Sequence, residues 1–263
     1  MGARLKISIL GSGTSTGVPT IACDCAVCSS PEAKNKRMRS SILITNLDTN
    51  EHLVVDTTPD FRMQMINHKV KRLNHVLYTH THADHCHGFD DLRAFYFGPK
   101  LPIHCWLVKG QIPELKKRFD YAFNSTGYSG VIPTIELHEI PMSGPFNIIG
   151  LPIEAISLEH GHVLTTAFKI GSFAYATDFK RFNDRQIAHW RGTISHMVAS
   201  GLRFREHPTH SSVDETLALF EKLQVKRGVI THLSHEVDFH RDSSKLPPNA
   251  EFAYDGLSFE VEI

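Results

Sequence analysis

One short stretch, Thr79-His80-Thr81-His82-Ala83-Asp84-His85, limits what this chain can fold into and what it can do. Residues 74–78 just before it are apolar and β-branched, which predicts a strand that runs into the motif. Alternate side chains of an extended backbone share a face, so His80 and His82 point the same way. The Asp-His pair that closes the motif follows where the chain can turn toward a neighbouring point. Neutral imidazoles and a carboxylate are ligands that zinc and manganese accept, so the stretch predicts two adjacent metal ions.

This pattern resembles the signature of the metallo-β-lactamase superfamily, in which two metal ions lie between two β-sheets. Further along the chain His160, Asp178 and His232 each lie at the end of a predicted strand. The resemblance implies two ligand sets, namely His80, His82 and His160 for one divalent ion and Asp84, His85 and His232 for the other, with Asp178 bridging both. His162 is an alternative to His160, but the superfamily's histidine falls directly at the strand end, which favours His160. The donor types suit manganese and zinc alike.

Residue patterns along the chain predict strands in two batches, each accompanied by helices. The predicted strands are residues 5–10, 40–45, 52–55, 74–78, 103–108, 134–140, 146–158, 165–170, 173–177, 194–199 and 227–231. The predicted helices are one capped by Thr58 that ends at about Asn67, one over 114–119, one over 183–190, and one that begins with a capping box from Ser212 to Glu215. Asp255-Gly256 predicts a C-terminal hairpin. This order suits an α/β fold of two mixed sheets flanked by helices, the four-layer αβ/βα sandwich of the superfamily, with residues 1–263 as a single domain.

Composition restricts the class of substrate and the cellular location. The 263 residues carry 28 Lys and Arg against 28 Asp and Glu, so the formal net charge is zero. A neutral balance does not favour nucleic acid as a partner, because that recognition rests on a broad basic surface. The sequence shows no secretory signal and no apolar run of about 20 residues that could span a membrane. We therefore expect a cytoplasmic protein without a membrane partner that acts on a small molecule.

Three cysteines crowd into the cluster Cys23-Asp24-Cys25-Ala26-Val27-Cys28, one ligand short of a closed tetrahedral zinc site. Gly-Ser-Gly-Thr at 11–14, Gly-Val-Pro at 17–19, this cluster and Thr-His-x-Ser-His at 231–235 resemble the cyclic phosphate phosphodiesterases of the phosphonate-utilising pathway, the PhnP-like group. The resemblance implies that His235 completes a structural zinc site with Cys23, Cys25 and Cys28. The zinc would clamp an N-terminal loop of about residues 11–40 to the C-terminal part. The same resemblance implies a homodimer.

The same group places a catalytic histidine just before the helix that precedes the last ligand strand. His210 occupies that place, with His207 as a nearby alternative, and Asp84 and His210 are the residues assigned to catalysis. Residues 198–201 lack the acidic or cysteine-containing sequence of the phosphonate-pathway enzyme, so the reaction class is better defined than the substrate. Residues 119–130 are either a substrate-covering loop or a surface loop anchored by its aromatic side chains.

The resemblance therefore implies a phosphodiesterase with two metal ions, which hydrolyses a small cyclic phosphodiester by means of a metal-activated hydroxide. Rival readings are a tRNA 3′-processing nuclease, a thioesterase or lactonase of the same fold, and a metal-binding or nucleic-acid-binding module without activity. The nuclease should carry a basic arm, which the sequence lacks. A decayed module should lack ligands, whereas here the set is complete.

Overall fold

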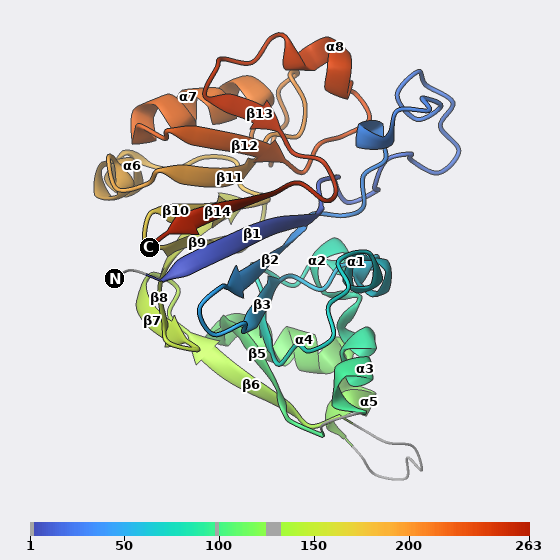
Figure 1. The fold of residues 1–263 in the computed structure, drawn as a ribbon, viewed down its shortest axis with the longest axis vertical. Coiled ribbons are helices and arrows are strands. Elements are labelled where there is room, and N and C mark those ends of the chain that lie inside the picture. The colour runs from blue at the N-terminus through green and yellow to red at the C-terminus, as the bar shows by residue number, and fades with distance from the viewer. Residues whose placement is uncertain (1–2, 98–99, 125–132) are drawn as a thin grey trace.

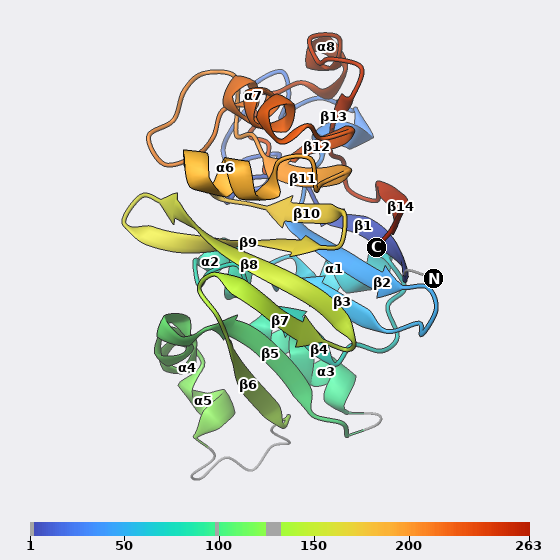
Figure 2. The ribbon, with the colours of Figure 1, turned by 90° about the vertical axis from the view of Figure 1, so that its left-hand side faces the viewer.

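The computed structural model describes residues 3–97, 100–124 and 133–263. Two seven-stranded sheets pack face to face, and helices cover the outer face of each sheet (Figure 1). In the turned view α6 and α7 lie at the upper end beside β10 to β12, and α4 and α5 lie at the lower end beside β5 and β6 (Figure 2). This arrangement confirms the predicted four-layer αβ/βα sandwich.

The two sheets share one plan. The first contains, in spatial order, β14 (Ser258–Glu262), β1 (Arg4–Gly11), β2 (Ser41–Asn46), β3 (His52–Val55), β4 (His75–Leu77), β5 (Ile103–Val108) and β6 (Ile135–Ile140). The second contains β13 (Ala250–Phe252), β12 (Arg227–Thr231), β11 (His196–Ser200), β10 (Phe173–Ala176), β9 (Val163–Ile170), β8 (Leu151–His160) and β7 (Gly144–Ile148). In the first sheet β14, β1, β2 and β3 pair antiparallel, and β3 to β6 run parallel. In the second sheet β7 to β10 pair antiparallel, and β10 to β13 run parallel.

The helices belong to the outer layers. Those on the side of the first sheet are α1 (Phe61–Asn67), α2 (Ala83–Cys86), η2 (Phe89–Leu92), α3 (Arg93–Tyr96), η3 (Lys109–Gln111), α4 (Ile112–Arg118) and α5 (Asp120–Phe123). Those of the other half are α6 (Asp184–Trp190), α7 (Val213–Leu223) and α8 (Phe239–Ser243), and η1 (Ala33–Asn35) lies in the segment between β1 and β2. None of the helices in the described part of the chain is both long and apolar enough to cross a membrane.

The core between the sheets follows from the period-2 pattern of the strands. Leu5, Ile7 and Ile9 alternate along β1 and are fully buried in the same apolar cluster as Phe168 and Tyr175 of the other sheet. Burying one such side chain stabilises the fold by about 1.5–3 kcal/mol. The core therefore fixes the position of one sheet on the other, which sets the distance between the strand ends that carry the site.

Two predicted boundaries were wrong for local reasons. The helix that should begin at Thr58 begins at Phe61, because the Thr58 hydroxyl accepts a hydrogen bond from the Asp60 amide and closes a turn before the helix. Residues 146–158 form the two strands of the hairpin β7–β8 rather than one strand. Ile149 and Gly150 both adopt positive φ, 48° and 77°, as a tight two-residue hairpin turn requires.

The predicted C-terminal hairpin at Asp255-Gly256 was also wrong, because this dipeptide carries the chain from one sheet to the other. β13 pairs with β12, whereas β14 pairs with β1. The Asp255 carboxylate accepts hydrogen bonds from the amide and hydroxyl of Ser12, at 2.9 and 2.8 Å, and from the Met38 amide at 2.7 Å. The aspartate therefore holds the crossing chain against the N-terminal segment.

α7 packs closely on β12, the strand that leads to His232, and a substitution at Gly228 tests this packing. A Cβ atom at Gly228 would lie 2.3 Å from the Phe220 ring of α7. We expect Gly228→Ala to lower the free energy of unfolding by about 1–3 kcal/mol, the usual cost of overpacking, in urea denaturation of the metal-loaded protein. Gly110→Ala is the matched control, because nothing lies within 4 Å of its Cβ position. Equal midpoints for the two variants would contradict this packing.

Candidate metal centre

Seven side chains meet where strand ends of the two sheets converge. They come from the turn after β4, from α2, from the last residue of β8 and from the residues that follow β10 and β12. They form two groups, His80 with His82 and His160, and Asp84 with His85, Asp178 and His232. Within each group the potential ligand atoms lie within 4.8 Å of one another. The structure thus brings together every residue that the sequence analysis assigned to the two-metal site.

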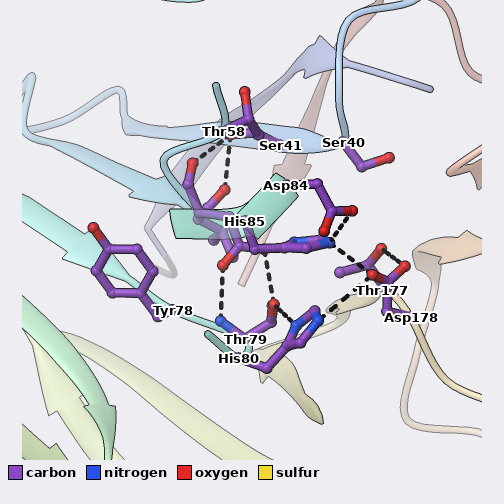
Figure 3. A network of polar contacts seen from close by, with 12 residues as sticks. Ser40, Ser41, Thr58, Tyr78, Thr79, His80, Asp84, His85, Thr177 and Asp178 are labelled. Carbon is purple, nitrogen blue, oxygen red and sulfur yellow. Dashed lines mark hydrogen bonds and ion pairs between the residues drawn. The ribbon is translucent and has the colours of Figure 1, made fainter. Parts of the chain in front are cut away.

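Asp178 lies between the two groups. Its Oδ2 is 2.6 Å from His85 Nε2 and 3.7 Å from His80 Nε2 (Figure 3). Its Oδ1 is 2.8 Å from His232 Nε2. His80 belongs to one group and the other two histidines to the second. A single carboxylate therefore faces both groups, which is the position that a bridging ligand needs.

Strained backbone aims several of these side chains inward. Asp178 and His232 have φ of 52° and 59°, and Asp56, which follows β3, has φ of 68°. Non-glycine residues rarely adopt this left-handed conformation, which costs of order 1–3 kcal/mol and gathers at functional sites. All three side chains are buried. The sharp turn at each strand end points the side chain into the space between the sheets instead of along the strand.

A buried set of hydrogen bonds orients the imidazole rings. Asp56 accepts hydrogen bonds from the amide and hydroxyl of Thr79, both at 2.8 Å, and from His85 Nδ1 at 2.7 Å. The Thr79 hydroxyl donates to Asp56, so it accepts from His80 Nδ1 at 3.0 Å. His160 Nδ1 donates to the Thr209 carbonyl at 3.2 Å. Each ring therefore turns its Nε2 toward the centre, as metal-binding histidines do when the other nitrogen is held.

The electrostatics of the site fit divalent ions. Nε2 of His80 is buried and has no hydrogen-bond partner among the described residues, which is rare for a buried polar atom. Burial and the neighbouring His85 hold the pKa of His80 well below its usual range, so this ring is the neutral form that a metal needs.

In the protein without bound metal ions, protonated histidines balance the negative charge of the carboxylates. Burial would lower the pKa of His85, but Asp84, Asp178 and Asp56 together raise it well above its usual value. Burial also acts against the charged form of His232, but Asp178 and Asp84 raise its pKa to about 9. Bound cations would take over this role from the two protons.

His210 lies against both groups. Its Nδ1 is 3.7 Å from Asp178 Oδ1, and its ring stacks on His232 at 5.1 Å and meets His160 edge-on at 4.7 Å. Burial, more than the nearby histidines, lowers the pKa of His210 to about 3. The alternatives left open by the sequence lie farther out, since His162 is exposed beyond the end of β8 and His207 belongs to neither group.

A cleft of about 400 Å³ opens beside His80 and His82. Its lip is apolar, because the partly exposed side chains of Met142, Val163 and Leu164 line it. Its polar wall comes from η3 and α4 and includes Gln111, Glu114 and Arg118. The predicted covering loop lies only partly in view, since residues 120–123 form α5 and residues 125–130 lie outside the described residues.

The cysteine cluster meets His235 as the resemblance implied. The Sγ atoms of Cys23, Cys25 and Cys28 lie 3.1, 3.5 and 3.6 Å from His235 Nδ1. The Cys28 amide donates to Cys25 and is the main reason that the pKa of Cys25 falls to about 6, which favours the thiolate. The N-terminal segment between β1 and β2, which carries the three cysteines, lies beside α8 (Figure 1). The four donors form the kind of closed set that structural zinc uses.

Sequence reasoning named the donor residues that the structure groups together, but it left most of the residues that orient them open. The superfamily resemblance leaves two roles for Asp56, support of the metal site or a turn cap, and in the structure its carboxylate accepts a hydrogen bond from His85 Nδ1. Thr79 and Thr209 were not singled out. The available signal for Asp56 was its position, because it directly follows β3, which runs parallel to β4, and parallel strands end at the same edge of a sheet.

Comparisons with known proteins agree with this geometry. The model of the β-lactamase superfamily domain matches residues 51–233, more than half of the chain. The chain therefore belongs to the β-lactamase superfamily, and the fold and site define a metal-dependent hydrolase. Within the superfamily the chain is PhnP-like. Its sequence is 34% identical to that of a diphosphatase from the PhnP family whose crystal structure is known. The two structures superpose with a TM-score of 0.91 over 100% of this chain and 99% of that one.

Two further relatives are informative. The chain is 33% identical over 260 residues to an octanoyltransferase of Porphyromonas gingivalis, a match that covers 98% of this chain and 52% of the relative. The chain thus spans about half the length of this curated relative. Zn²⁺-bound PqqB from Methylobacterium extorquens is 20% identical, with a TM-score of 0.76 over 97% of this chain and 100% of that one. The second likeness shows the fold alone.

The raised pKa values of His85 and His232 predict that metal binding releases protons. Below about pH 9 His232 holds a proton, and the raised pKa of His85 keeps that ring protonated at neutral pH as well. An incoming ion must displace these protons, so metal affinity should rise with pH. Each displaced proton contributes up to about tenfold in affinity per pH unit, and the slope should fall above about pH 9. Calorimetric titration with Mn²⁺ in two buffers of different ionisation enthalpy counts the protons. His162→Ala should release as many as wild type, and a titration without proton release would contradict the prediction.

The four-donor cluster predicts one zinc ion that outlasts the others. A mild chelator should strip the open His/Asp site and leave one Zn²⁺ per chain, because a closed thiolate-rich site releases its ion slowly. Cys25→Ser should lose that ion and lower the melting temperature. Asp24→Ser is the matched control, since Asp24 is exposed between two of the cysteines. Elemental analysis that finds equal zinc in both variants would rule the site out.

Proposed function

We propose that this protein hydrolyses a small phosphodiester with two divalent ions, manganese or zinc, at the site between the sheets. One observation carries the proposal: Asp178 faces both donor groups, and His210 lies beside it. The two groups would hold one ion each, with Asp178 as the shared ligand. Bound in this way, two ions supply a hydroxide near neutral pH and offset the charge that builds up on a phosphate. A further Zn²⁺ would occupy the cluster of Cys23, Cys25, Cys28 and His235 and hold the N-terminal loop.

The protein's own residues prepare this chemistry. Asp56 holds His85, and Thr79 holds His80, in the orientation that directs Nε2 toward the centre of the site. His210 belongs to neither donor group, and its Nδ1 lies 3.7 Å from Asp178. Its low pKa makes it a neutral imidazole at pH 7, so it acts by donating a hydrogen bond to the departing oxygen instead of carrying a full positive charge. Asp84 serves as a ligand that keeps negative charge close to the nucleophile.

The cleft and the charge balance favour a small substrate, most specifically a five-membered ribose cyclic phosphate. A volume of about 400 Å³ accommodates a phosphorylated sugar, with Arg118 at the polar wall to meet an anion. The net charge of zero does not favour a long polyanion, whose binding depends on many salt-sensitive contacts. As further proposals, the protein acts in the cytoplasm, where free thiols persist, and forms a homodimer without a membrane or nucleic-acid partner.

A substrate panel separates this proposal from its rivals. The panel contains a ribose cyclic phosphate, a linear phosphodiester, a nucleoside diphosphate, a tRNA precursor, a lactone and an octanoyl thioester. The nucleoside diphosphate represents the activity for which the PhnP-family diphosphatase is named. The thioester represents the octanoyltransferase, a name that belongs to a protein about twice as long. We expect the cyclic phosphate to give the highest kcat/KM, and faster turnover of the tRNA precursor or the thioester would overturn the proposal.

His210 predicts a defect that depends on the leaving group. His210→Ala should lower kcat on a ribose cyclic phosphate by about 10²–10³-fold, the cost of losing one donor to a developing negative charge, with metal content unchanged. The defect should shrink on a nitrophenyl phosphodiester, because an acidic leaving group needs less help. His207→Ala is the matched control, since its ring lies 5.0 Å from that of His210 but outside the donor groups. A His207→Ala defect as large as that of His210→Ala would reject the assignment.

A further inference from the structure

A third set of metal-binding side chains lies away from the proposed active site. His104 on β5 pairs with Glu136 on β6, and His138 follows two residues later on the same face of β6. These residues lie near the beginning of their strands, whereas the proposed active site follows the ends of strands. β6 is the edge strand of its sheet (Figure 2).

The three donor atoms are spaced like the ligands of one ion. His104 Nδ1 lies 2.9 Å from His138 Nε2 and 3.2 Å from Glu136 Oε2, and the remaining pair is 3.8 Å apart. Metal–ligand bonds of about 2.0–2.2 Å place neighbouring ligands about 2.9–3.5 Å apart, depending on the coordination angle. Two of the three separations, 2.9 and 3.2 Å, fall within this range, and the third, at 3.8 Å, is slightly longer. By contrast, His189 with Glu154 is a two-residue surface pair that belongs to none of the groups of possible ligands.

Ring stacking restricts the motion of both imidazoles. His138 stacks on Trp106 at 4.2 Å, and His104 stacks on His75 at 5.0 Å. The three ligand side chains keep between 27% and 46% of their surface exposed, so an ion can enter from solvent.

We propose that His104, Glu136 and His138 bind a third class of metal ion, a single divalent transition ion such as Zn²⁺, which ties the edge strand β6 to β5. Two imidazoles and one carboxylate are a ligand set that zinc uses, with water completing the shell. Among the described strands β6 pairs with β5 alone, so an ion held between the two strands adds a cross-link at this edge of the sheet.

The experiment counts ions in protein that is already metal-loaded. Wild-type holoprotein is titrated with Zn²⁺ by calorimetry, and bound zinc is measured after gel filtration. We expect one additional ion per chain in wild type and at least about tenfold weaker binding in Glu136→Gln and in His138→Ala. Both variants should keep wild-type phosphodiesterase activity. His189→Ala is the matched control and should retain the extra ion.

A spectroscopic readout tests the location. Co²⁺ bound at this site should quench the fluorescence of Trp106, which stacks on His138, and the quenching should saturate at one equivalent. Glu136→Gln keeps that stack, so it should lose the quenching without losing the tryptophan environment. Equal zinc content in wild type and Glu136→Gln, or loss of the extra ion in His189→Ala, would overturn the proposal. Loss of the active-site ions in Glu136→Gln would overturn it as well.

Discussion

The buried carboxylate of Asp178 is the group on which the rest of the site depends. Burial opposes its charge, yet His232 and His85 hold its pKa well below the usual range. A buried carboxylate without such partners would cost several kcal/mol or take up a proton. Its left-handed backbone is a second cost, which the surrounding strands must offset. The site therefore combines backbone strain with buried charge, and the proposed divalent ions would neutralise its carboxylates.

That arrangement exists only because two sheets meet. The motif 79–85 and α2 belong to the half built on β1 to β6, whereas His160, Asp178 and His232 follow strands of the other sheet. The Thr166 amide of β9 donates a hydrogen bond to the Thr79 carbonyl at 3.0 Å and joins the two halves beside the ligands. The apolar core between the sheets fixes their separation. The packing that stabilises the core therefore also sets the geometry of the site.

The other two donor clusters lie where the sheets provide less support. The N-terminal segment between β1 and β2 contains only the short helix η1, and Cys23, Cys25 and Cys28 meet His235 across it. Arg37 strengthens the same junction, since it is buried and donates to the carbonyl oxygens of Ser234 and Val237. The cluster on β5 and β6 lies at an edge strand. In both places an ion would supply the cross-link that a central strand receives from its neighbours.

The sequence by itself indicated most of the strands and the capping box of α7, because these are local patterns of period and spacing. It also carried the family resemblance, which implies the donor residues at the strand ends. Only the tertiary structure decided that Asp255-Gly256 crosses between sheets, that Asp56 supports His85, and that His104 faces Glu136 across 32 positions. These facts depend on strand register and sheet packing, where the partner of a residue is chosen by distant segments. Local chemistry names the candidates, and long-range packing chooses which of them meet.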